Sequence, residues 1–191
     1  WRQPLGILSS VAVAVGVVPG VVALADGGFR APSTPLARLV DQALPEAAAE
    51  GGYNVLYLGD ARILPVPGTE YRSGLSWAIV DDDDLAATDR WMPPPNDASD
   101  VVTAALDEMA AASTLRAGRL LAPLGIRFIV VPEFDDVVSS VEDPLELPVG
   151  LVPALEDQLD LVAREPRLPT VELFENRAWL PRVSMLEGDA A

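Results

Sequence analysis

The sequence predicts an α/β fold in which a small mixed, partly parallel sheet with flanking helices is preceded by one transmembrane helix. Three observations predict it. An uncharged apolar run near the start is long enough to cross a bilayer. Short apolar runs bounded by glycine or proline alternate with amphipathic segments through the rest of the chain. One of these runs directly follows a long helical pattern, which is typical of parallel strand pairing.

The composition excludes several classes of function. The chain has 29 Asp and Glu against 13 Arg and no Lys, so its net charge is −16. This balance repels nucleic acid, and it disfavours docking on an anionic lipid surface. The chain also has no Cys and no His, which excludes thiolate nucleophiles, disulfides, imidazole metal ligands and histidine-based catalytic triads. We therefore predict no catalytic residue and no cofactor.

Residues 5–25 form the apolar run, LGILSSVAVAVGVVPGVVALA. Arg2 precedes it and Asp26 follows it, so the positive-inside rule places the N-terminus in the cytoplasm and the acidic body outside. We expect residues 1–26 to be a transmembrane helix with its flank, and residues 27–191 to be an extracytoplasmic acidic α/β domain. Two alternatives are a signal peptide cleaved after Ala25 and a buried strand or helix of the domain itself.

The first part of the body contains one helix after a linker. Residues 27–35 are rich in glycine, proline and serine, as linkers are. Residues 36–49 are predicted to be an amphipathic helix, with an apolar face formed by Leu36, Leu39, Val40 and Leu44. Pro45 ends or kinks this helix, and two glycines at positions 51 and 52 follow it.

Two strands and two loops come next. The runs YNVLYL at residues 53–58 and LSWAIV at residues 75–80 predict buried strands. Residues 61–74 hold two prolines and two glycines, and residues 81–95 are acidic and end in three prolines, so both stretches are predicted to be loops.

A long helix is predicted at residues 99–124, because apolar side chains recur there at spacings of three and four. Gly125 suits the position after its C-terminus. The run IRFIVV at residues 126–131 follows as a strand without polar alternation, which favours a parallel pairing that is covered on both faces.

The last third is predicted to hold one more helix and two more strands. Residues 133–148 form an acidic loop, and residues 151–164 form a helix. The apolar face of that helix contains Leu151, Leu155, Leu159 and Val162. Residues 170–174 and 182–186 are the final strands.

A run of four aspartates at positions 81–84 raises the question of a metal site. Asp82 and Asp84 match the D-x-D pattern that holds a divalent cation in many cytoplasmic glycosyltransferases, and hard cations prefer carboxylate oxygens. Neighbouring side chains of an extended segment point to opposite faces, so a usable cluster needs a turn. The favoured interpretation is a solvated acidic loop without metal.

Aromatic side chains in loops are the candidates for contact with a glycan, because an aromatic ring with one polar edge suits a sugar face. Trp91 and Tyr71 are the candidates for this role. Trp77 lies within an apolar strand, where packing in the core is the expected role. Arg72, Arg116, Arg119 and Arg127 could meet a phosphate, but pairing with the many carboxylates is the expected role.

Five stretches in a fixed order resemble one family. They are LYLGDARILPVPG, YRSGLSWAIVDDD, GRLLAPLGIRFIVVP, GLVPALEDQLDLV and ELFENRAWLPRVSML. Together they resemble the extracytoplasmic region of large actinobacterial multi-pass membrane glycosyltransferases, in which a cytoplasmic family 2 glycosyltransferase domain precedes many membrane helices. The resemblance covers residues 53–186, and its most specific parts are LAPLGIRFIVVP and FENRAWLPR.

The resemblance implies a role in assembling cell-envelope glycans at the cell membrane. The sugar-transfer residues would lie upstream, so this domain would be non-catalytic. The first hypothesis for its role is that it positions an acceptor or a polyprenyl-linked sugar. The expected partners are membrane lipid around residues 5–25 and an envelope glycan or lipid-linked sugar, with no nucleic acid. Alternatives are an anchored or secreted module that binds a glycan or solute, and a purely structural domain that supports membrane helices.

Overall fold

A computed structural model describes the following residues: 36, 40, 43–45, 51–81, 97–133, 139, 143, 145, 147–164 and 171–181. All of them lie in one compact unit, Thr34–Ala191. The transmembrane prediction for residues 5–25 and the strand predicted at residues 182–186 lie outside the described residues. Within the described parts of the chain, no helix combines the length and apolarity that a membrane span requires.

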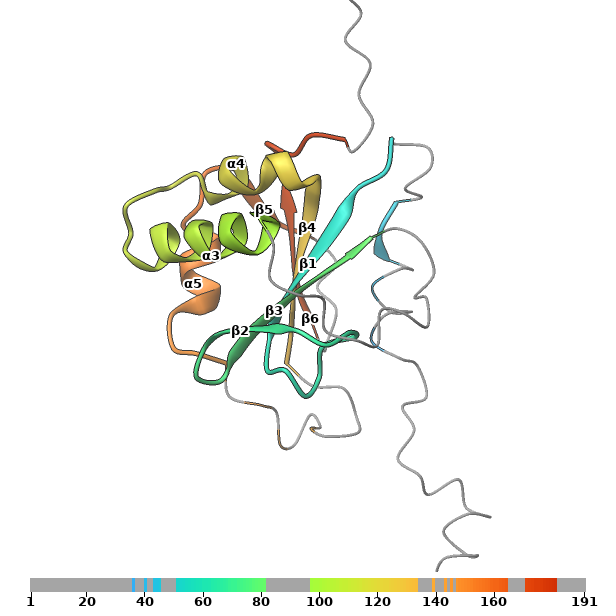
Figure 1. Cartoon of the computed structure of the whole chain (residues 1–191), viewed down its shortest axis with the longest axis vertical. Coiled ribbons are helices and arrows are strands. Elements are labelled where there is room, and N and C mark those ends of the chain that lie inside the picture. The colour runs from blue at the N-terminus through green and yellow to red at the C-terminus, as the bar shows by residue number, and fades with distance from the viewer. Residues whose placement is uncertain are drawn as a thin grey trace, which may run out of the picture. The chain divides into compact units, whose positions relative to one another are not determined.

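The centre of the fold is a six-stranded sheet with the order β2-β3-β1-β4-β6-β5. The strand bounds are as follows: β1 Asn54–Gly59, β2 Thr69–Arg72, β3 Leu75–Asp81, β4 Ile126–Pro132, β5 Leu161–Ala163 and β6 Val171–Asn176. The neighbours β1 and β4 are parallel, and the other pairings between described strands are antiparallel. The predicted mixed, partly parallel sheet is therefore confirmed (Figure 1).

The parallel pair forms the middle of the sheet. Leu56 of β1 lies opposite Ile129 of β4, and on the other side of β1 it lies opposite Ile79 of β3. Side chains of β1 and β4 are buried on both faces of the sheet, which explains why these strands are nearly continuous apolar runs. The prediction of parallel pairing with both faces covered is confirmed.

The prediction of a single long helix at residues 99–124 is wrong. The chain forms α3 at Asp97–Ala110, α4 at Ala117–Leu121 and a 3₁₀ turn, η3, at Ala122–Leu124. The break falls at residues 111–116, where Ala112 has a φ of 52° and the Ser113 hydroxyl donates to the carbonyl of Glu108. Beyond the break, side chains from a distant segment cap the start of α4, and these tertiary contacts outweigh helix propensity. Gly125 does end the segment in the left-handed conformation, with a φ of 66°.

The helix predicted at residues 151–164 is also too long. Helix α5 spans Leu151–Glu156, and the chain then turns into the edge strand β5. Leu159 is exposed instead of facing the core, and Val162 belongs to β5. The helix ends early because Gln158 and Asp160 face α4, which a continuous helix would not allow.

The loop predicted at residues 61–74 contains a strand that the sequence reasoning missed. β2 is a four-residue edge strand, TEYR, with half-buried and exposed side chains in alternation. A short charged edge strand carries little apolar signal, and such edges are a common protection against aggregation.

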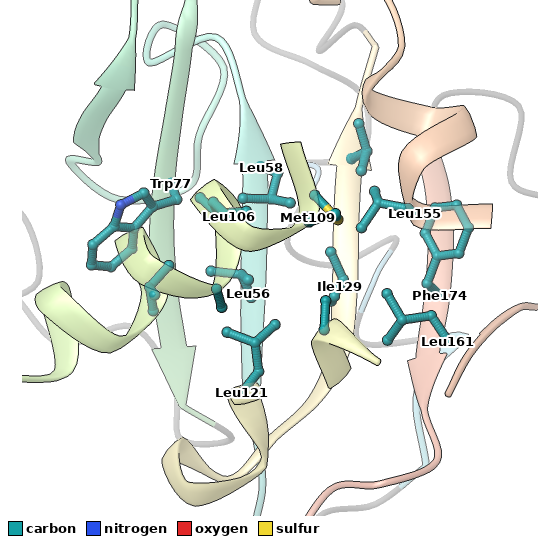
Figure 2. Close-up of a cluster of buried hydrophobic side chains, with 14 of the residues drawn as sticks. Leu56, Leu58, Trp77, Leu106, Met109, Leu121, Ile129, Leu155, Leu161 and Phe174 are labelled. Carbon is teal, nitrogen blue, oxygen red and sulfur yellow. The ribbon is translucent and has the colours of Figure 1, made fainter. Parts of the chain in front are cut away.

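Two apolar layers cover the sheet. On one face, α3, α4 and α5 pack on β1, β3, β4 and β6 through the side chains shown in Figure 2, which include Leu106, Leu121 and Leu155. On the other face, Leu36 and Val40 pack against Tyr53, Phe128 and their neighbours. Leu36, Val40 and Ala43 are helical, as predicted, and the Leu44 N–H donates to the Val40 carbonyl just before Pro45.

Candidate functional site

Most of the predicted site residues lie outside the described residues. This holds for both metal candidates, Asp82 and Asp84, and for Trp91. In the part of the chain that the structure describes, no group of three or more carboxylates is arranged to hold a metal ion.

The strand order separates the two acidic segments that the sequence places after strands. Asp81 ends β3 and lies opposite Asn54, at the start of β1. Glu133 follows β4, which is parallel to β1, and Pro132 contacts Gly59 at the far end of β1. Asp81 and Glu133 are therefore at opposite ends of the sheet, and the loops that begin after β1 and β3 leave from opposite ends as well.

Tyr71, the other glycan candidate, lies half-buried on β2 and is held on two sides. Its hydroxyl donates to Asp107 Oδ1 of α3 at 2.6 Å, and the Arg72 guanidinium lies 4.7 Å from its ring centroid. Arg72 also contacts the same carboxylate oxygen at 3.2 Å. Burial, and next the hydrogen bond to Asp107, raise the pKa of Tyr71 to about 12. These contacts fasten the β2–β3 hairpin to α3, and one face of the ring is covered by Arg72.

The turn after β1 is fixed by a local ion pair. The Asp60 carboxylate accepts hydrogen bonds from the backbone N–H of Arg62 at 2.9 Å and from Arg62 Nη2 at 2.7 Å. The side-chain hydrogen bond from Arg62 lowers the pKa of Asp60 below its usual value, although burial acts in the opposite direction. Such a turn gives the loop at the carboxyl end of β1 a defined start.

A buried polar cluster that the sequence reasoning missed lies under the N-terminus of α4. The Asp160 carboxylate accepts the backbone N–H groups of Gly118 at 3.2 Å and Arg119 at 2.8 Å. Gln158 Oε1 accepts the N–H of Ala117 at 2.9 Å, and Gln158 Nε2 donates to the Ala154 carbonyl. The first N–H groups of a helix have no partner within the helix, and here two buried side chains satisfy them.

Asn176 completes this cluster from the end of β6. Its fully buried side-chain amide donates to the carbonyls of Gly118 and Ile126, both at 2.8 Å, and its Oδ1 accepts the N–H of Ala178. The backbone of Arg177 donates to the Asp160 carbonyl at 2.8 Å. The cluster thus joins α4, β4, the end of β6 and the turn after α5. The N-terminus of α4, which would otherwise attract an anion, already holds a carboxylate of the same chain.

The sequence carried one signal for this cluster. Two polar residues, Gln158 and Asp160, interrupt an apolar pattern, but the spacing of their apolar neighbours favoured a helix, whereas the structure places both residues in the turn between α5 and β5. The partners are 41 or 42 residues away, so no local rule could assign them.

A cationic and aromatic cluster lies on the opposite face of the sheet. The Arg127 guanidinium lies 4.8 Å from the ring centroid of Trp179, 5.1 Å from Phe128 and 5.4 Å from Tyr53. Glu175 lies 3.6 Å from Arg127 and 3.2 Å from Arg164, so the pairing with a carboxylate predicted for Arg127 is confirmed. Tyr53 is buried, and its hydroxyl donates to the Pro45 carbonyl at 2.6 Å. These rings pack around a cation of the chain itself.

The apolar core leaves a cavity of about 10 Å³ between β1, β4 and the three helices, lined by residues such as Leu58, Met109 and Leu155. That volume holds about one water, and its apolar walls offer such a water no partners. Trp77 lies in the same core, as predicted, and its indole N–H finds no acceptor among the described residues.

The polar side chains of the cluster beneath α4 therefore join distant segments of the fold, and the Asp60–Arg62 ion pair defines the start of the loop at the carboxyl end of β1. No protein-family model, curated protein or solved structure matches this chain.

Proposed function

We propose that the chain is a non-catalytic extracytoplasmic domain of a membrane glycosyltransferase that acts in cell-envelope glycan assembly, and that it positions the acceptor or a lipid-linked sugar. The observation that carries the proposal is the ordered resemblance of five stretches, taken together with the structural roles of their residues.

Residues from three of these stretches meet in the cluster beneath α4. Gly118 begins GRLLAPLGIRFIVVP, Gln158 and Asp160 belong to GLVPALEDQLDLV, and Asn176 belongs to ELFENRAWLPRVSML. Buried hydrogen bonds between residues 41 to 58 positions apart in the sequence help to specify a fold. A resemblance carried by such residues supports a shared domain more than a shared reaction.

The other two stretches contain turns at the ends of strands, one after β1 and one in the β2–β3 hairpin. The Asp60–Arg62 ion pair lies in LYLGDARILPVPG, and Gly74, with a φ of 79°, turns the β2–β3 hairpin in YRSGLSWAIVDDD. Ligand-contacting groups are usually carried by loops on a rigid scaffold, and in sheets with parallel strands they gather at the carboxyl ends. We place the ligand-contacting surface on the loop of residues 60–68, beside the ends of β1 and β4.

Two measurements test this proposal on the full chain. A reporter enzyme that is active only outside the cytoplasm, fused after Ala191, should be active in cells. Calorimetric titration with a short-chain polyprenyl phosphate sugar should show saturable binding. Arg62→Ala should weaken it more than Arg72→Ala, because Arg72 lies on the edge strand β2 and not in the loop. An inactive reporter would contradict the topology, and equal effects of both substitutions would contradict the placement on the loop.

A purely structural domain is the second candidate, and one observation favours it. The hydrogen bonds formed by the side chains of Gln158, Asp160 and Asn176 go to backbone groups of the same chain. If the reporter is active but no glycan or polyprenyl phosphate sugar binds, this second function replaces the first.

A further inference from the structure

We draw no further inference here: the strongest candidate, the outer edge of strand β5 with the exposed side chains of Leu115 and Leu159 beside its start, carries nothing further because nothing in the described residues shows what covers it.

Discussion

The side chain of Asn176 occupies the space that a Cβ on Gly118 would need. A Cβ built at Gly118 would overlap Asn176 Oδ1 and would come within 3.0 Å of Asp160 Cγ. Asn176 itself is fully buried and donates to the Gly118 carbonyl. The close approach of α4 to β6 thus depends on a residue without a side chain, in a helix where an alanine would otherwise be preferred.

Gly118→Ala should therefore destabilise the fold by about 1–3 kcal/mol, because overpacking displaces the buried amide and carboxylate. Helix propensity alone predicts the opposite sign, with a gain of about 1 kcal/mol. Urea denaturation followed by circular dichroism measures the difference. In an Asn176→Ala background the cost of the alanine should fall, and a cost that stays the same in both backgrounds would rule out this contact as its source.

Asp160→Asn should cost about 1–3 kcal/mol of stability, because the amide offers one acceptor in place of two to the N–H groups of Gly118 and Arg119. Asp157→Asn is the matched control, since that carboxylate is exposed a few residues earlier. Thermal unfolding of both variants measures the contrast. Hydrogen exchange should also accelerate in α4 of the Asp160 variant, and unchanged protection there would show that the carboxylate does not hold the helix.

Arg127→Lys should destabilise the fold by about 1–2 kcal/mol. Its guanidinium lies over three rings and beside Glu175, and a lysine cannot stack its planar face on them. Arg164→Lys is the control, since Arg164 is the more exposed partner of Glu175 and should cost less than about 0.5 kcal/mol. Chemical denaturation measures the free energy of unfolding of both variants. Equal losses of stability would mean that stacking on the rings contributes nothing beyond the charge.

Tyr71 should titrate near pH 12, about two units above an ordinary tyrosine. Because the folded-state pKa is raised, the associated stability is fully present below about pH 10 and is lost as the pH rises through about 12. Ultraviolet difference spectra between the natural chain and Tyr71→Phe isolate this tyrosinate. Asp107→Asn should lower the pKa only partly, since burial is the larger cause and the hydrogen bond the smaller one. A titration near pH 10 in the unsubstituted chain would contradict the contacts of Tyr71 with Asp107 and α3.

The sequence predicted the parts of the fold whose signal is local. The strands β1, β3 and β4 are buried runs bounded by glycine, proline or acidic residues, and each was placed within one residue of its ends. Gly125 was recognised as a helix terminator because the left-handed conformation favours glycine. A parallel pairing of β4 was predicted from its lack of polar alternation, and the structure identifies β1 as the partner.

The sequence determined by itself the acidic balance, the absence of cysteine and histidine, the central buried strands and the alternation of helices with strands. The tertiary structure decided where the predicted helices end, because Gln158 and Asp160 find their partners 41 or 42 residues away at the start of α4. It also decided that the loops after β1 and β3 leave opposite ends of the sheet. Periodicity reports only which side of a segment is apolar, whereas a buried hydrogen bond is satisfied by whichever residue the fold brings to it.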